Sequence, residues 1–382
     1  MTETTLATRP TGRAHVPPST RADRTDGHDV PTGREENWRF TPTKRLRGLL
    51  PAKPATGEAT VDVEAPADVI VDTVGREDDR LGVTGSPTEY VARAAWESFA
   101  KATVLTVPKE VRPERPVLVT VTGPGAGQIG YGHLQVRADR FAEAVVVIDY
   151  RGSGSYAENV EFVVGEGAKL TVVAVYDWAD DAVHVTGHQA SLGRDAVLRH
   201  TVVSLGGDLV RISPTVRFTE RGGDAELIGL YFADAGQHLE HRLFVDHAVP
   251  HCRSNVAYKG ALQGEGAHTV WIGDVLIRAQ AEGTDTYELN RNLVLTDGAR
   301  ADSVPNLEIE TGEIAGAGHA SATGRFDDEQ LFYLRARGIP EDQARRLVVR
   351  GFFHEVLMKI AVPEVRERLE AAIEAELAVV GV

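Results

Sequence analysis

Four of the histidines and the only cysteine of the chain lie within one short stretch, "QHLEHRLFVDHAVPHC". Histidine and cysteine are the ligands that zinc prefers, so this stretch is a candidate metal site. On an extended strand His241 and His247 would share a face, but their Cα atoms would lie roughly 20 Å apart, too far for one ion. His247, His251 and Cys252 could meet only if the chain folds back at the proline between them. They are therefore weaker metal candidates, and histidines that only form hydrogen bonds are the alternative.

Another histidine, His319, stands among small residues in "AGAGHASATGRF". A neutral imidazole binds iron and other transition metals, and small neighbours would let the backbone of a second chain approach it. From these residues alone the favoured interpretation is an imidazole that only forms a hydrogen bond to an adjacent strand, and metal binding is the alternative. The residues that follow are rich in acids and predict a short helix that Asp327 caps and Gly338 ends.

A glycine-rich loop suggests a different chemistry. The run "GPGAGQIG" places Gly125, Gly127 and Gly130 in G-x-G-x-x-G spacing after a strand-like segment, and Asp149 follows roughly 20 residues later, as in a dinucleotide-binding fingerprint. That fingerprint needs a helix that begins within the glycines. The residues that follow alternate between apolar and polar, as a strand does. We therefore expect a hairpin turn, with a dinucleotide-binding oxidoreductase as the alternative.

No other motif in the sequence indicates catalysis. It contains neither a G-x-x-x-x-G-K-[ST] phosphate loop nor a G-x-S-x-G nucleophile elbow. The acid pairs Asp180/Asp181 and Asp327/Asp328 fall in an expected turn and at an expected helix start, where carboxylates stabilise the backbone. A polysaccharide-active enzyme is a further alternative for a β-rich chain. It would need clustered acids in an exposed groove, and the sequence shows no such cluster.

The composition narrows the class of protein. With 382 residues the chain is long enough for two or three domains. Its 56 acidic and 41 basic residues give a net charge of −15, which argues against a nucleic-acid surface. No apolar run is long enough to span a membrane, and the N-terminus lacks the apolar core of a signal peptide. The single cysteine excludes an internal disulfide, and we expect a cytoplasmic protein.

The pattern along the chain predicts four regions. Residues 1–34 have few large apolar side chains and are expected to form a disordered tail. Residues 35–115 are expected to form a small N-terminal helical region. Short runs rich in Val, Ile, Leu and Thr, separated by Gly/Asp turns, fill residues 116–324 and predict strands. Residues 325–382 predict a C-terminal helical domain.

A small motif recurs within the strand region. A turn residue followed by alanine occurs at Ala168, Ala196, Ala225, Ala267 and Ala299, at nearly regular intervals except for a wider one between Ala225 and Ala267. Such spacing predicts a parallel β-helix, in which each turn stacks on the next and the alanine points into a narrow interior. The one irregular interval leaves a β-sandwich as the alternative.

The C-terminal region predicts helices with one apolar stripe. Apolar residues recur at every fourth position from Ala344 to Val356, and Phe352 and Phe353 are adjacent. A small helical unit cannot bury side chains on both faces, so we expect one of these phenylalanines to contact a partner. Burial of both in the core is the alternative. We also expect these helices to cap the open end of the β-helix, because solenoids need a cap.

Several consecutive blocks carry a resemblance to a known family: "HCRSNVAYKG", "NRNLVLTDGARADSVPNLEI", "GHASATGRFDDEQLFYLRARGI" and the "GFF" that follows. Over about residues 185–360 the chain resembles the SufB/SufD family of iron–sulfur cluster assembly proteins. "REENWRFTP", near the N-terminus, is similar to another motif of that family. The resemblance implies a right-handed parallel β-helix between helical regions, and a scaffold rather than an enzyme.

The resemblance also implies partners. In the family a SufB-like and a SufD-like chain pair through their β-helices, and each binds a SufC-type ATPase through its C-terminal helices. Phe352 and Phe353 are the candidate ATPase contacts. The chain alone is expected to bind no cofactor tightly, and an iron–sulfur cluster would form transiently at the interface with the partner. Without that partner a homodimer is possible.

Within the family the chain is most similar to the SufD subunit. The position two residues before His319, often cysteine in the family, is Ala317 here, and Cys252 is the only thiol. SufB-like members hold sulfur and cluster on cysteines, because the thiolate is the nucleophile and the iron ligand. The resemblance implies that His319 lies at the interface between the two β-helices and holds the nascent cluster. Without a cysteine at position 317, this side of the interface keeps one candidate ligand rather than two.

Overall fold

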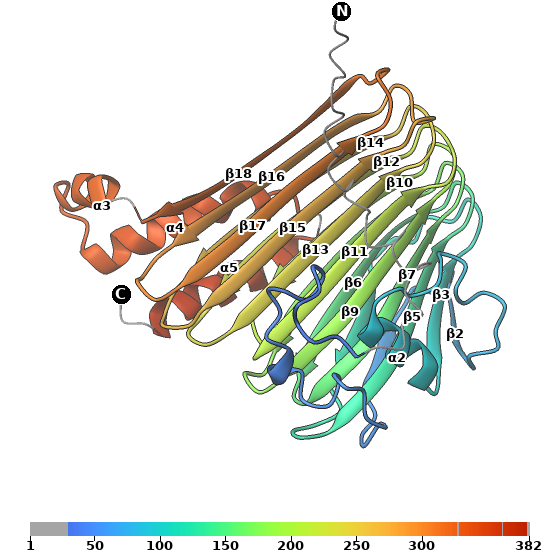
Figure 1. Ribbon diagram of the computed structural model, residues 1–382, viewed down its shortest axis with the longest axis horizontal. Helices are drawn as coiled ribbons and strands as arrows, with labels where there is room; N and C mark the ends of the chain where they lie inside the picture. Colours follow the sequence, from blue (N-terminus) through green and yellow to red (C-terminus); the bar gives the residue numbers. More distant parts are fainter. Residues whose placement is uncertain (1–29, 327, 361, 380–382) are drawn as a thin grey trace, which may run out of the picture.

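The computed structural model describes residues 30–326, 328–360 and 362–379 of the chain. These residues form a parallel β-solenoid, which confirms the mainly β architecture predicted from the sequence (Figure 1). Almost all of the predicted tail, residues 1–34, lies outside the described residues, as does Asp327, the predicted helix cap.

Two nine-stranded sheets face each other, and from β3 onward the chain alternates between them (Figure 1). Neighbouring strands are parallel except for two antiparallel pairs, β1 with β4 and β2 with β3, at the N-terminal edges. Sheet I contains, in spatial order, β1 (Thr60–Glu64), β4 (Val117–Thr122), β6 (Glu143–Gly152), β8 (Lys169–Trp178), β10 (Val197–Ser204), β12 (Asp224–Ala233), β14 (Arg253–Leu262), β16 (Asp285–Val294) and β18 (Gly316–Arg325). Sheet II contains β2 (Ile70–Val74), β3 (Ala102–Val107), β5 (Ile129–Ala138), β7 (Ser155–Val164), β9 (Val183–Leu192), β11 (Leu209–Phe218), β13 (His238–His247), β15 (His268–Ile277) and β17 (Arg300–Ile309).

Alternating burial explains why these segments are strands. Along β16 every second side chain from Thr286 to Val294 is buried, and those between are exposed or half-buried. The buried set points into the space between the sheets, because successive side chains of a strand point to opposite faces. One column of in-register partners, one from each successive turn, runs through Val172, His200, Leu227, Val256, Glu288 and His319.

The recurring alanines lie at the corners of the solenoid, as predicted. Ala168 and Ala196 immediately precede strands of sheet I, and Ala267 precedes a strand of sheet II; all three are fully buried. The wider interval, between Ala225 and Ala267, arises because the motif moves there from sheet I to sheet II. The β-sandwich alternative is therefore not needed to explain it.

The segment before the solenoid is less helical than predicted. Between residues 35 and 115 the structure has a short 3₁₀ helix η2 (Thr43–Arg45), one α-helix, α2 (Tyr90–Ser98), and the three strands β1 to β3. Both sheets thus begin well before residue 116. Trp38 and Val91 pack with apolar residues on the outer face of sheet II, so this segment covers that sheet.

The C-terminal helices are α3 (Asp328–Arg335), α4 (Glu341–Leu357) and α5 (Pro363–Val379). The expectation that they cap the open end is wrong. α4 and α5 pack on the outer face of sheet I, where Phe353 and Leu369 join a cluster with Val173, Ile228 and Phe232 (Figure 1). The outer face of sheet I is apolar and needs cover, and this requirement decides where α4 and α5 lie. None of the helices within the described ranges is long and apolar enough to cross a membrane.

Glycines make room for large aromatic rings in the interior, and two examples lie in sheet I. A Cβ atom on Gly260 would overlap the ring of Tyr231, and one on Gly229 would overlap the ring of Tyr258. Gly260→Ala is therefore expected to lower the free energy of unfolding by roughly 1–3 kcal/mol, through overpacking. Gly324→Ala is the matched control, because a Cβ atom there meets nothing within 4 Å. Urea unfolding followed by circular dichroism measures both, and equal midpoints for the two variants would contradict the prediction.

Candidate functional site

The solenoid ends in two strands that have only one neighbour each. Within the described ranges no strand pairs with the outer side of β17 or β18. Their side chains are mostly half-buried or exposed, whereas every side chain of β13 is buried. Edge strands offer a row of free N–H and C=O groups that a strand of another chain can join. The open end is therefore a candidate interface.

His319 lies near the middle of β18, in this edge, and is exposed. Its in-register partner on β16 is the buried Glu288. Parallel neighbours in register point to the same face of a sheet, so His319 projects toward the space between the sheets, at its open end. Ala317, the position that is often cysteine in the resembling family, is half-buried two residues before it. The structure thus places the predicted cluster ligand at the rim of the solenoid.

The interior near this end contains a hydrogen-bonded polar cluster. Asn292 donates hydrogen bonds to Ser303 Oγ at 2.9 Å and Thr323 Oγ1 at 3.2 Å, and accepts one from the Tyr231 hydroxyl at 2.6 Å. These bonds tie the last turns of the two sheets together. Glu288 takes no part, because neither of its carboxyl oxygens has a hydrogen-bond partner among the described groups. Burial, with a smaller contribution from Asp274, raises the pKa of Glu288 to about 8.

The predicted histidine and cysteine cluster is not assembled as a metal site. His247 Nε2 hydrogen-bonds Ser254 Oγ at 2.8 Å, inside the solenoid. His251 is exposed in the following turn, and the buried Cys252 thiol donates to the Glu220 carbonyl oxygen at 3.6 Å. Burial raises the pKa of Cys252 above its usual value. No group of three or more His, Cys, Asp or Glu side chains in the described ranges is placed to hold a metal ion.

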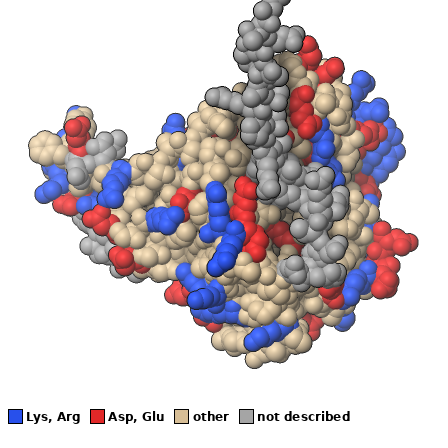
Figure 2. All heavy atoms as spheres, in the orientation of Figure 1, with Lys and Arg blue, Asp and Glu red and all other residues tan. Residues whose placement is uncertain are grey.

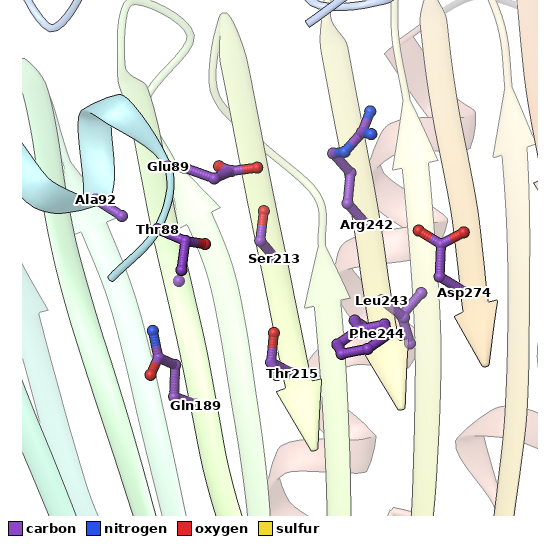
Figure 3. A pocket seen from close by; sticks show the side chains of 11 residues that line it. Thr88, Glu89, Ala92, Gln189, Ser213, Thr215, Arg242, Leu243, Phe244 and Asp274 are labelled. Carbon is purple, nitrogen blue, oxygen red and sulfur yellow. The ribbon is translucent and has the colours of Figure 1, made fainter. Parts of the chain in front are cut away.

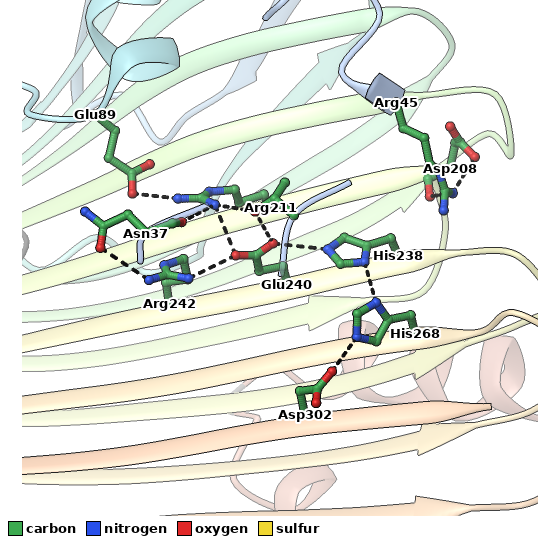
Figure 4. Close-up of polar contacts among 11 residues, drawn as sticks. Asn37, Arg45, Glu89, Asp208, Arg211, His238, Glu240, Arg242, His268 and Asp302 are labelled. Atoms are coloured by element: carbon green, nitrogen blue, oxygen red, sulfur yellow. Dashed lines mark hydrogen bonds and ion pairs between the residues drawn. The ribbon is translucent and has the colours of Figure 1, made fainter. Parts of the chain in front are cut away.

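A buried charge network that the sequence analysis missed lies on the outer face of sheet II (Figure 4). The guanidinium of Arg211 contacts Glu89 at 2.7 Å and Glu240 at 3.1 Å. Burial alone would raise the pKa of Glu240, but the charge of Arg211 and a hydrogen bond from His238 outweigh it and hold that pKa below its usual range. No sequence motif links these residues. The network fastens the N-terminal segment to the solenoid.

From Glu240 the network continues toward the open end. His238 and His268 join through their Nδ1 atoms at 3.1 Å, and His268 Nε2 contacts Asp302 at 2.7 Å (Figure 4). Asp302 belongs to the edge strand β17. The contacts are those of a structural network, in which charges and hydrogen bonds are paired. A small cavity beside it, of about 60 Å³, is lined by Ser213, Thr215 and other side chains (Figure 3). It holds a few water molecules at most and is too small for a cofactor.

The glycine loop has no helix. Gly125 and Gly127 have positive φ angles of 106° and 73°, and Gln128 N–H donates to the Gly125 carbonyl oxygen in a tight turn. Gly130 already belongs to β5. The dinucleotide fingerprint therefore lacks the helix N-terminus that would hold a pyrophosphate.

A polysaccharide-active site is not supported either. A groove of about 350 Å³ along a corner of sheet I contains the acids Asp224, Glu226 and Asp285. Arg199 pairs with the first two, and an ion pair at 3.3 Å joins Arg253 to Asp285. Carboxylates neutralised in this way serve stability rather than acid–base catalysis. Acidic and basic side chains are also interspersed on the face in Figure 2, without a continuous basic patch.

The two phenylalanines of α4 have different surroundings. Phe353 is fully buried against sheet I, and Phe352 is half-buried with the Lys259 ammonium 5.4 Å from its ring. Away from the sheet, α4 and α5 border a groove of about 330 Å³ whose lining includes Leu347, His354 and Ile373. Leu347 is 47% exposed. The apolar surface that α4 leaves open is thus centred on Leu347 rather than on the phenylalanines.

Comparisons with known proteins agree on one family. The family model described as "SUF system FeS cluster assembly, SufBD core domain" matches residues 120–352. An iron–sulfur cluster assembly SufBD family protein of Mycobacterium tuberculosis is 67% identical over 359 residues, which cover 92% of this chain and 90% of that protein. One from Mycobacterium leprae is 63% identical over 361 residues, 93% of this chain and 92% of that protein.

Mycobacterium leprae also has a second, more distant SufBD family protein. It is 24% identical over 220 residues, which are 58% of this chain and 25% of that protein. These matches confirm the resemblance seen in the sequence blocks around His319, and the solenoid spans most of the matched region. The chain belongs to the SufBD family of iron–sulfur cluster assembly proteins.

Proposed function

We propose that this chain is a SufD-like scaffold subunit of a SUF assembly complex, without turnover of its own, that acts in the cytoplasm. The observation that carries the proposal is the open end of the solenoid, where within the described structure β17 and β18 have a free edge and β18 carries the exposed His319. A second SufBD family protein in the genome of a relative supports pairing between two such chains. In this proposal an iron–sulfur cluster is cargo that resides transiently at the interface.

The state of the only thiol supports the SufD-like assignment. A sulfur acceptor needs an accessible thiolate. Cys252 is fully buried, and burial raises the pKa of its thiol. The rim of the open end carries alanine at position 317 instead of a second thiol. Sulfur is therefore expected to arrive on the cysteine-bearing paralogue, and His319 to be a ligand that this chain contributes.

The edges suggest how the two chains pair. β18 consists mostly of glycine, alanine and serine, so the backbone of a second chain can approach without displacing large side chains. β17 ends the other sheet at the same end of the solenoid. A SufB-like chain with matching edges would extend both sheets by main-chain hydrogen bonds.

Co-expression with the SufB-like paralogue tests this proposal. The tagged wild-type chain should capture the paralogue in a stoichiometric complex. Ala322→Pro and Thr323→Pro are compared because alternate residues of a strand direct their N–H groups to opposite neighbours. One of the two variants should keep the pairing of β18 with β16 and the wild-type melting temperature, yet no longer capture the paralogue. Capture of the paralogue by whichever variant keeps the wild-type melting temperature would exclude β18 as the interface.

We further propose that a SufC-type ATPase binds the groove between α4 and α5. Leu347→Glu places a charge on its exposed rim and is expected to weaken ATPase capture at least about tenfold, because a charge would lie in an apolar contact. Ile70→Glu is the control, since Ile70 is 49% exposed on β2, outside the C-terminal helices. Biolayer interferometry with the purified ATPase measures both. Equal affinities for the two variants would place the contact elsewhere, with the half-buried Phe352 the next residue to test.

A further inference from the structure

Glu288 is a carboxyl group that the solenoid buries without a partner. Its exposed fraction is 1%, and both oxygens lack a hydrogen bond within the described structure. Burying an unpaired acid costs several kcal/mol relative to water, and an apolar side chain of similar size would avoid that cost. A buried polar group left unsatisfied in this way needs an explanation other than packing.

The surroundings of Glu288 keep room for its carboxyl group. Glu288 reaches across the interior from sheet I to Gly273 of sheet II, where an added Cβ would come within 2.7 Å of Glu288 Oε1. Any other residue at position 273 would therefore displace the acid or the indole ring of Trp271. The indole N–H of Trp271, whose ring also borders Gly273, has no hydrogen-bond partner either. Polar atoms thus gather here without satisfying one another.

On the side of the open end, the strand next to Glu288 carries His319 in register with it. The two are in-register partners on β16 and β18, so their Cα atoms are about 4.8 Å apart and their side chains point to the same face. His319 is exposed, whereas Glu288 lies one turn deeper. Side chains of in-register neighbours on adjacent strands lie close enough to contact one another.

We propose that Glu288 and His319 form a two-ligand iron(II) site at the open end of the solenoid. Imidazole nitrogen and carboxylate oxygen are both suitable ligands for iron(II). Two ligands from one chain leave the other coordination positions to groups of a second chain, so the ion is bound weakly and can be released as cargo. The inference rests on the proposed function, because only a partner at the open end would complete the site.

Anaerobic titration of the full-length chain with cobalt(II), followed by its visible absorption and repeated in competition with iron(II), tests the site. The wild-type chain is expected to bind one ion. Glu288→Gln, which keeps the side-chain volume, and His319→Ala should each weaken binding at least about tenfold. Thr286→Val is the control, because Thr286 lies on the same face of β16 and bonds Ser254 instead. Unchanged binding by Glu288→Gln would overturn the proposal.

A second variant at the same position keeps the proposal testable if Glu288→Gln does not fold. Glu288→Asp keeps the carboxylate but shortens its reach, so binding weaker than wild type supports the site and unchanged binding contradicts it. Capture of the paralogue by the same proteins separates the two proposals. If the paralogue is still captured but the Glu288 variants bind cobalt(II) as tightly as the wild type, only the metal-site proposal is wrong. If the wild-type chain does not capture the paralogue but cobalt(II) binding depends on both Glu288 and His319, the pairing proposal is wrong. The metal-site proposal is then still supported.

Discussion

Acidification from pH 7 to pH 4 is expected to unfold this protein cooperatively, with a midpoint near pH 5. Burial lowers the pKa of His200 to about 4, of His241 to about 3 and of His247 to about 4. Above about pH 6.5 these histidines are neutral in both folded and unfolded chains, so they do not affect stability. Between about pH 6.5 and pH 4 the unfolded chain binds more of these protons than the folded chain, so the folded state loses stability as the pH falls. At pH 4 this costs the folded state roughly 3 kcal/mol per histidine, a total comparable with the stability of a whole domain.

A single substitution shows whether the histidines are responsible. His241 stacks on Tyr231 with ring centroids 4.9 Å apart, so His241→Phe keeps a ring in place and removes one titrating group. The acid midpoint should then fall by roughly half a pH unit. His319→Ala, on the exposed last strand, should leave it unchanged. Circular dichroism and tryptophan fluorescence as functions of pH measure all three proteins, and an unchanged midpoint for His241→Phe would show that other groups control acid unfolding.

Arg211→Met is expected to lower the free energy of unfolding by roughly 3–5 kcal/mol. The substitution leaves the carboxylate of Glu240 buried beside a weaker set of partners, and breaking a buried ion pair on one side typically has this cost. It also removes the guanidinium that lies 4.1 Å from the ring of Trp38 and bonds the Asn37 carbonyl oxygen. The N-terminal segment should therefore exchange its amide hydrogens faster, whereas β16 and β18 should not.

Two further variants make the Arg211 prediction specific. Arg300→Met breaks an exposed ion pair with Asp302 and is expected to change stability by less than about 0.5 kcal/mol. The double variant Arg211→Met/Glu240→Leu removes both partners and should recover part of the lost stability. If Arg211→Met costs no more than Arg300→Met in denaturant unfolding, the buried network does not fasten the N-terminal segment.

Local sequence patterns predict the strands but not what covers them. The alternation of apolar and polar residues and the recurring alanines identify the solenoid, because the residue order of each strand shows which side chains face inward and which face outward. The position of α4 depends on a distant surface instead. The four-residue spacing that links Ala344 to Phe352 predicts one buried face, yet Phe353 is the fully buried phenylalanine. Val349, Phe353 and Val356 are also helically spaced, and contact with the apolar outer face of sheet I decides which of the two apolar stripes is buried.

The candidate site, like the fold, could be predicted only in part from local sequence patterns. His319 could be singled out because an imidazole among small residues is unusual and because the surrounding block resembles a family motif. Glu288 could not be singled out from the sequence, since a full turn of the solenoid separates it from His319 along the chain. The length of that turn places the two residues in register on neighbouring strands. Arg211 and Glu240 likewise lie in register on neighbouring strands of sheet II, one turn apart in the sequence. Knowing the exact turn length would have revealed both pairs.

The two free strand edges have a consequence for how the protein is produced. A chain synthesised in excess of its partner would carry both edges exposed, and such edges promote aggregation. Proteins with this liability are safer when both subunits are made in equal amounts and meet soon after synthesis. Overproduction of this chain alone should therefore yield inclusion bodies or rapid proteolysis, and balanced expression of the pair should relieve both. The solenoid end that suits assembly thus also makes the cell depend on subunit stoichiometry.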